Sequence, residues 1–141
     1  MMPKKLSKKC CQCGKPVFSI RSIYCRECSY FSARMSNERF PPETREQLWS
    51  YVRRDKGYFC HYTKQKLDVF DYTSQWFLEF DHVIPHNPKE IVFASAWVNE
   101  MKADMTIKEF KGSVAQLYNY WFKGIKIKKK KFRYWYRLKP R

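Results

Sequence analysis

Two segments of this chain decide its fold, Phe80-Asp81-His82-Val83-Ile84-Pro85 and, after a turn and an apolar stretch, Asn99-Glu100-Met101-Lys102. An imidazole beside a carboxylate supplies a proton acceptor and a hard oxygen ligand, and an amide oxygen supplies a second such ligand. Metal-assisted hydrolysis of a phosphodiester needs these parts. The pattern therefore predicts a hydrolytic site that uses a divalent cation.

The sequence around these segments predicts two strands and a helix. Residues 76–83 are expected as a first strand and residues 90–94 as a second, with a proline-containing turn between them. Ser95 is placed to cap the helix that follows. Asn99 falls about one turn inside this helix. Its side chain is therefore expected to point back at the first strand.

The stretch resembles the HNH endonuclease family, which is built on the ββα-metal finger, in its variant with asparagine at the last motif position. The resemblance covers about residues 57–105, roughly a third of the chain. Asp-His-Val-Ile-Pro followed by Asn-x-x-Lys carries it, because a lone Asp-His pair occurs by chance. The resemblance implies that the chain cuts DNA.

The resemblance also implies a role for three residues. His82 would deprotonate the attacking water, while Asp81 and Asn99 would hold one catalytic cation, magnesium or manganese. Histidine side chains have an ordinary pKa of about 6.5, so they accept a proton near neutral pH. A carboxylate and an amide carbonyl form a hard oxygen pair, which suits these cations better than zinc.

The chain departs from the family at one position. In the family an asparagine at the start of the second strand orients the catalytic histidine, and Glu90 stands there in this chain. Asn87 lies three residues earlier and would need a rearranged loop to substitute. Either Glu90 accepts the imidazole N–H and strengthens the base, or the histidine is oriented less well.

The same residues also have plain structural interpretations. His82 is then a core histidine and Asp81 a turn residue. Lys102 is then a solvated helix residue. We expect His61 and His86 to be solvated loop residues rather than further ligands.

Five of the six cysteines lie in the first 28 residues. Two Cys-x-x-Cys knuckles can close tetrahedrally around a structural zinc ion through Cys10, Cys13, Cys25 and Cys28. The alternative is a set of reactive or redox thiols. Cys11 is either free or replaces its neighbour as a ligand. Cys60 stands alone, with Thr63 at the matching partner position, and is expected to be a buried apolar thiol.

The charge of the chain points to a polyanionic partner. Lys and Arg number 29 against 13 Asp and Glu, which gives a formal net charge of +16. Such an imbalance causes self-repulsion unless a partner such as nucleic acid offsets it. No stretch approaches the ~18 apolar residues of a spanning helix, so no membrane is expected.

The compartment follows from the start of the chain, which carries lysines and no apolar leader. We expect an intracellular protein that is not secreted and that acts in the cytoplasm or nucleoid of a bacterial or virus-infected host cell. Thiols stay reduced there, which favours zinc over disulfides.

Ten of the last nineteen residues are basic, and aromatic residues are interleaved among them. Lysines can neutralise phosphates, and aromatic rings can stack on unpaired bases. The alternative is a solvated tail with a short basic edge strand. The candidate nucleic-acid contacts are Lys126, Lys128, Lys129, Lys130, Lys131, Arg133, Trp135 and Arg137.

Three segments before the motif can be assigned. Residues 29–41 are expected as a connection, partly helical around 32–35, and a helix is expected from Pro42 to Gly57. Residues 58–62 are expected as a short strand or the remnant of a cysteine knuckle.

One segment after the motif predicts a last helix, because Thr106 begins a capping box there. Apolar residues recur on one side of this helix at helical spacing. This apolar stripe is expected to be core and consists of Phe110, Val114, Leu117 and Trp121.

The predicted fold class is α+β, with a ββα-metal (HNH) nuclease core, a zinc-ribbon-like N-terminal module and helices flanking the hairpin. Four regions follow: a four-cysteine zinc module over 1–30, a connecting segment and helix over 31–56, the nuclease core with its C-terminal helix over 57–122, and a basic aromatic tail over 123–141.

The predicted function is that of a metal-dependent endonuclease on duplex DNA, with single-stranded contacts as an option. One constellation per chain makes a nick the natural product unless two chains pair. A non-catalytic zinc-dependent nucleic-acid-binding protein is the alternative, and an RNA-directed or ribosome-associated factor is a third. The sequence specifies neither the target nor the oligomeric state.

Overall fold

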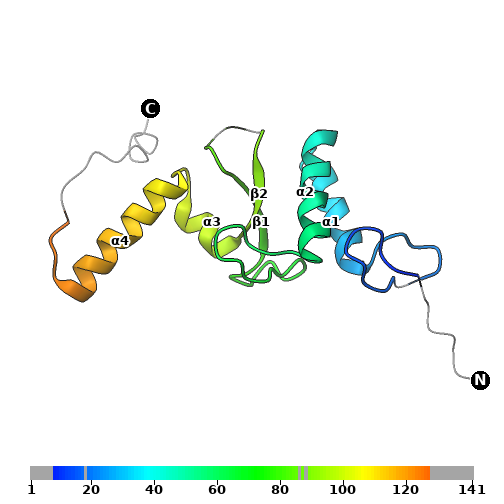
Figure 1. Ribbon diagram of the computed structural model, residues 1–141, viewed down its shortest axis with the longest axis horizontal. Helices are drawn as coiled ribbons and strands as arrows, with labels where there is room; N and C mark the ends of the chain where they lie inside the picture. Colours follow the sequence, from blue (N-terminus) through cyan, green and yellow to red (C-terminus); the bar gives the residue numbers. More distant parts are fainter. Residues whose placement is uncertain (1–7, 18, 86, 88, 128–141) are drawn as a thin grey trace, which may run out of the picture.

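The structure is a computed structural model that describes residues 8–17, 19–85, 87 and 89–127. Its described part holds four helices and a two-stranded antiparallel sheet, which confirms the α+β prediction. Figure 1 shows these elements spread along one axis, from the cysteine-rich segment through α1 and α2 to the hairpin, α3 and finally α4.

Helix α1 (Arg26–Asn37) starts from the second cysteine knuckle. Cys25 caps it, since its Sγ accepts a bond from the Cys28 backbone N–H at 3.4 Å. The buried residues Cys28, Phe31 and Met35 recur three and four positions apart and form one apolar face. The predicted connection over 29–41 is helical around 32–35, as expected, but the helix is longer than predicted and begins at Arg26, because a cysteine is not among the residues that ordinarily indicate a helix start.

Helix α2 (Pro42–Asp55) confirms the helix predicted after Pro41. Proline suits the first helical position, where its missing N–H costs no hydrogen bond. The helix ends at Lys56, which takes the left-handed conformation at φ 51° in place of the neighbouring Gly57. Its buried face consists of Thr44, Leu48, Trp49 and Val52.

Strands β1 (Leu78–His82) and β2 (Ile91–Ser95) form the antiparallel hairpin. The first strand is shorter than predicted, because the Phe77 N–H bonds the Ser74 carbonyl at 3.0 Å and Phe77 forms an isolated bridge with Asp68 outside the hairpin. The register pairs Asp81 with Val92. The predicted order of two strands and a helix is thus present.

Helix α3 (Ala96–Lys102) follows β2 without a loop. Ser95 caps it as predicted, with its hydroxyl oxygen accepting the Val98 N–H at 3.2 Å. This cap sets the helix directly against the hairpin, and the side chain of Lys102 reaches back to β1.

Helix α4 (Ile107–Lys123) is capped by Thr106, as predicted. Within the described structure none of its residues is buried, and Trp121 is 66% exposed. The prediction that its apolar stripe is core is therefore wrong: the periodicity identified an apolar face but not a covering element, and Figure 1 shows α4 standing away from the hairpin. No helix in the described part of the chain is both long and apolar enough to cross a bilayer.

One aromatic core joins the cysteine-rich segment to the hairpin. The ring of Phe31 lies 5.1 Å from that of Trp49, 5.0 Å from Tyr58 and 5.4 Å from Phe93. The four knuckle cysteines belong to the same buried cluster. On the rim of this core, Arg34 of α1 donates a 2.6 Å hydrogen bond to a backbone carbonyl of β1. The knuckles and the hairpin therefore depend on shared packing.

Replacing Cys28 by Ser should loosen the hairpin as well as the knuckles, because Cys28 and Phe31 lie on the same buried face of α1. We expect amide hydrogen exchange in β2 to accelerate at least about tenfold, equivalent to roughly 1.4 kcal/mol of local stability. Cys11→Ser is the matched control, since Cys11 is exposed. Unchanged protection of β2 in the Cys28 variant would contradict the coupling.

Candidate functional site

The four knuckle sulfurs converge on one point. The Sγ atoms of Cys10, Cys13, Cys25 and Cys28 all lie within 4.8 Å of one another, and all four residues are buried. A tetrahedral zinc ion with bonds of about 2.3 Å would set its sulfurs roughly 3.8 Å apart. The donor set therefore fits zinc. Cys11 is exposed and lies outside the cluster, so Cys10 is the thiol that this knuckle contributes beside Cys13.

The first knuckle is a tight turn over residues 9–16. The Cys10 N–H bonds the Lys15 carbonyl at 2.7 Å, and the Gly14 N–H returns to the Cys10 carbonyl at 3.1 Å. Gly14 takes the left-handed conformation at φ 78°, which glycine adopts without steric cost. A backbone bridge between Lys9 and Pro16 closes the turn.

The same turn recurs over residues 59–66. The Cys60 N–H bonds the Gln65 carbonyl at 2.9 Å, and the Lys64 N–H returns to the Cys60 carbonyl at 2.9 Å. Lys64 takes the left-handed place at φ 62°, and a bridge joins Phe59 to Lys66. The chain thus builds a second knuckle turn that lacks the second cysteine, as the remnant predicted from sequence would.

Cys60 is fully buried, as predicted. Its burial alone would raise the pKa of the thiol, but hydrogen bonds from Thr63 and from the backbone of Ser95 and Tyr62 outweigh it and lower that pKa. The sulfur thus gathers donors from the turn and from the end of β2. The second knuckle thus holds one buried sulfur and is closed by backbone hydrogen bonds.

Asp81 is the centre of a buried polar cluster. Its side chain is 7% exposed, and its Oδ2 lies 3.0 Å from the Nζ of Lys102, which is 1% exposed. The hydroxyl of Tyr62 donates to the same Oδ2. Burial, followed by this bond to Asp81, raises the pKa of the Tyr62 phenol well above its ordinary range, so the hydroxyl remains a donor. β1, α3 and the second knuckle each contribute one residue.

Asn99 lies within α3 and is half-buried. It stands three positions before Lys102, and residues three apart share one face of a helix. The ion pair between Lys102 and Asp81 turns that face toward the carboxylate. That Asp81 and Asn99 act as a pair stays a prediction, because the contact that the structure records between α3 and Asp81 is made by Lys102.

His82 ends β1 and is half-buried. Successive side chains of a strand point to opposite faces, so the imidazole leaves β1 on the face opposite the Asp81 carboxylate. It is the backbone of His82 that joins the polar cluster, where its carbonyl accepts a bond from Lys102 at 3.4 Å. The two neighbouring motif residues are therefore split between two faces at the end of the hairpin.

The two residues that were considered for orienting His82 make other contacts. Glu90 alternates with Val92 and so belongs to the Asp81 face, where it is exposed and lines a cavity. The side-chain oxygen of Asn87 accepts the Lys89 N–H at 3.0 Å within the turn.

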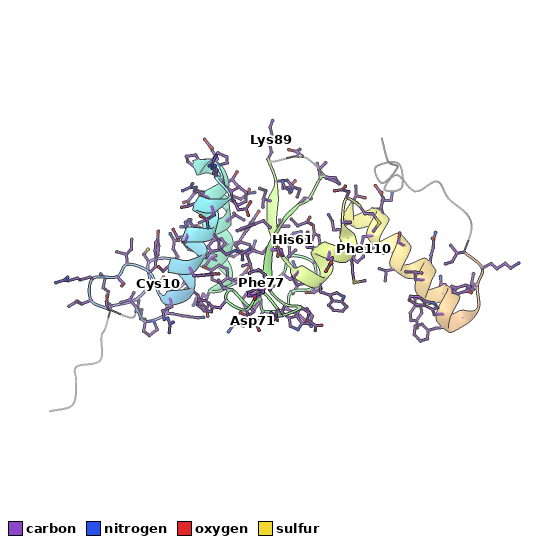
Figure 2. The ribbon with its side chains drawn as sticks, turned by 180° about the vertical axis from the view of Figure 1, so that it is seen from behind. Cys10, His61, Asp71, Phe77, Lys89 and Phe110 are labelled. Atoms are coloured by element: carbon purple, nitrogen blue, oxygen red, sulfur yellow. The ribbon has the colours of Figure 1, made fainter. Side chains whose placement is uncertain are left out.

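The cavity has a volume of about 600 Å³ and lies between the end of α2, the second knuckle and β2. Arg54, His61 and Lys64 line it together with Glu90. His61 is exposed, as predicted, and Figure 2 shows it beside the hairpin. Partial burial, followed by the charge of Lys64, lowers the pKa of His61, so this imidazole is neutral at neutral pH.

The sequence motif contains Lys102 without assigning it a role, and it omits Tyr62. Tyr62 belongs to the predicted knuckle remnant, and its place two residues after Cys60 is the only signal of its role in the sequence. Lys102 reads in isolation as a solvated residue, whereas the structure buries it completely. Its place one helical turn after Asn99 is the clue that both residues face the same partner.

Most of the predicted nucleic-acid contacts lie outside the described residues. Lys126 is described and exposed. The others fall between 128 and 141, and His86 is likewise outside the described part.

Comparisons of this chain with protein-family models, curated proteins and solved structures gave no match. The site itself therefore carries the functional argument.

Replacing Asp81 by Asn should destabilise the fold by about 3 kcal/mol, because it leaves the buried ammonium of Lys102 without a countercharge. Urea unfolding of the intact chain measures the change. Asp55→Asn is the matched control: its pair with Arg54 is partly exposed, and its loss should cost no more than about 1 kcal/mol. Equal losses in both variants would show that burial of the Asp81 pair does not matter.

Proposed function

We propose that this chain is a metal-dependent endonuclease of the HNH type that cuts duplex DNA. The observation that supports it most is the buried Asp81 carboxylate, which pairs with Lys102 of the helix that also carries Asn99. A buried carboxylate paired with a buried ammonium is uncommon in proteins and is found in functional sites or in structural ion pairs. The hairpin followed directly by this helix has the element order of the ββα-metal finger that the sequence resembles.

In this proposal Asp81 and Asn99 hold one magnesium or manganese ion. The ion supplies charge stabilisation at the phosphate and at the leaving oxygen. His82 accepts the proton of the attacking water on an imidazole nitrogen. The ring leaves β1 on the face opposite the Asp81 carboxylate, so this role requires the attacking water to lie at the end of the hairpin, where β1 stops.

The remaining features of the chain support binding of DNA. The net charge of +16 favours a polyanion, and exposed Lys8, Lys9 and Arg26 surround the cysteine cluster. That cluster would hold a structural zinc ion, which needs the reducing interior of a cell. The basic residues from Lys126 onward would add further contacts to the DNA phosphates. With one constellation per chain, the product is a nick unless two chains pair.

One observation favours a second candidate, a non-catalytic zinc-dependent nucleic-acid-binding protein. The split of Asp81 and His82 between two faces leaves Asp81 and Lys102 as a closed ion pair. Such a pair can be purely structural. The cysteine cluster and the charge serve this candidate equally well.

His82→Ala should abolish relaxation of a supercoiled plasmid in magnesium, with a loss of about 100-fold to 10,000-fold in rate, because the general base is removed. DNA retention in a gel-shift assay should survive. His61→Ala is the matched control, since this histidine lines the cavity outside the polar cluster. If His61→Ala and not His82→Ala stops cutting, the base is His61; if the parent does not cut, the binding-protein candidate stands.

Removal of residues 124–141 takes away nine of the 29 basic residues. The logarithm of the DNA-binding constant should then fall less steeply with salt, because each lost phosphate contact reduces the slope by about 0.9. Fluorescence anisotropy across a salt series measures it. Trp135→Ala is the control: it should keep the slope while weakening single-strand binding. An identical slope after truncation would exclude the tail as a phosphate contact.

A further inference from the structure

We propose that α4 pairs with the α4 of a second copy of this chain, with the two helices antiparallel. The contact surface is the seam, which adds one residue to the apolar stripe of α4 and consists of Ile107, Phe110, Val114, Leu117 and Trp121. The pairing does not depend on the proposed nuclease. It bears on that function because a pair of chains would carry two copies of the proposed site.

The spacing of the seam is that of a helix that packs on another helix. Its residues follow one another at intervals of three, four, three and four positions. This is the pattern of heptad positions a and d in a coiled coil, whereas a helix on a globular core has a wider apolar face. The side of α4 opposite the seam carries Gly112 and Asn119. The pattern therefore favours another helix as the partner.

The seam is open to other molecules. Val114 is 43% exposed, Leu117 40% and Trp121 66%, and no residue of α4 is buried among those that the structure describes. Figure 1 shows α4 extending away from the hairpin, so a second helix can lie along it without meeting the rest of the fold.

The exposed surface is large enough for a pair of chains. Tyr118 and Tyr120 flank the seam and are 52% and 53% exposed. Because aromatic side chains each carry roughly 150–250 Å², the seam and its flanks expose roughly 500 Å² in each chain. Two such surfaces come to about 1,000 Å², the lower bound for a specific interface, where complexes are weak or transient.

The seam is complementary to itself when the two helices run in opposite directions. Each residue at position a then faces a residue at position d of the other chain. Val114 meets the partner's Leu117, and Phe110 meets the partner's Trp121. Each of these layers joins a smaller side chain to a larger one, so the layers have similar volumes along the seam.

Charge also favours the antiparallel direction. Ten of the last nineteen residues are basic, beginning at Lys123 at the end of α4. Parallel helices would bring the two basic ends together, whereas antiparallel helices separate them by the length of α4, roughly 25 Å. This separation exceeds the Debye length of about 8 Å in physiological salt, so the repulsion is largely screened. Lys111 beside the seam then lies near the partner's Tyr118, whose ring attracts a cation.

A lipid surface fits α4 less well than a second copy does. A helix that lies on a membrane is rich in lysine or arginine along its polar face. In α4 the middle of that face holds Gly112, Gln116 and Asn119 instead.

The first test is sedimentation equilibrium of the full chain, with its cysteine cluster loaded with zinc and without DNA. We expect a monomer–dimer equilibrium with a dissociation constant on the order of 1–100 μM. Raising the salt from about 50 mM to about 500 mM should strengthen the dimer, because salt screens the repulsion between two basic chains and leaves the apolar contact. A chain that stays monomeric throughout, or a dimer that salt weakens, would overturn the proposal.

The second test places a charge in the seam. Leu117→Glu should weaken self-association at least about 100-fold, because the change removes an apolar contact and buries a carboxylate in both chains. Ala115→Glu is the matched control, since this exposed residue lies two positions away on another face of α4 and its variant should associate like the parent. Urea unfolding checks that both variants fold. Equal association of the two variants would overturn the seam.

The third test measures the direction of the helices. Nitroxide labels are attached to Lys123→Cys in a chain that also carries Cys11→Ser, because Cys11 is the exposed native thiol among the described residues. Pulsed electron paramagnetic resonance of the dimer should give a distance of roughly 25 Å between the labelled helix ends. A distance near about 10 Å, the usual spacing of neighbouring helix axes, would show parallel helices and overturn the antiparallel pair.

Two further outcomes separate this inference from its neighbours. A monomeric parent that binds vesicles of anionic lipid, with binding lost in Leu117→Glu and kept in Ala115→Glu, would assign the seam to a lipid surface and overturn the second copy. A parent that forms the dimer but leaves a supercoiled plasmid intact contradicts the nuclease and keeps the pairing, whereas a parent that cuts as a monomer contradicts the pairing alone.

Discussion

A carboxylate in a protein interior needs a countercharge or hydrogen-bond donors. In this chain three elements supply them to the carboxylate of Asp81. The hairpin carries it, α3 brings the ammonium of Lys102, and the second knuckle brings the hydroxyl of Tyr62. Separating such a pair leaves a desolvated charge, so the three elements are held in register by electrostatics as well as by packing. The position of α3 on the hairpin, and with it that of Asn99, follows from this requirement.

The same backbone turn occurs twice in the chain and has a different role in each place. In residues 9–16 the turn presents two of the four sulfurs of a cluster that could hold a zinc ion. In residues 59–66 the same backbone bonds are present with one sulfur, and protein donors surround that sulfur. The first turn joins α1 to the common core. The second turn carries Tyr62, whose hydroxyl donates to Asp81.

Local signals predicted the parts of this fold that depend on neighbouring residues. The caps at Ser95 and Thr106 indicated two helix starts correctly, because a hydroxyl three positions before its partner N–H is visible in sequence. Long-range relations were less accessible. The burial of Lys102 depends on a partner twenty-one positions away, and the side of the strand on which His82 emerges depends on the register. The spacing of apolar residues on α4 predicted an apolar face. It could not predict that no element of the described structure covers this face.

The isolation of α4 has a consequence for how the chain can vary. A helix that contributes nothing to the described interior can exchange its residues with little effect on whether the rest folds. Its exposed aromatic and aliphatic surface instead governs adhesion, since contiguous apolar patches promote contact with other molecules. Substitutions along α4 would therefore change the solubility of the protein and the molecules it contacts. The structure of the hairpin and of Asp81 would stay the same.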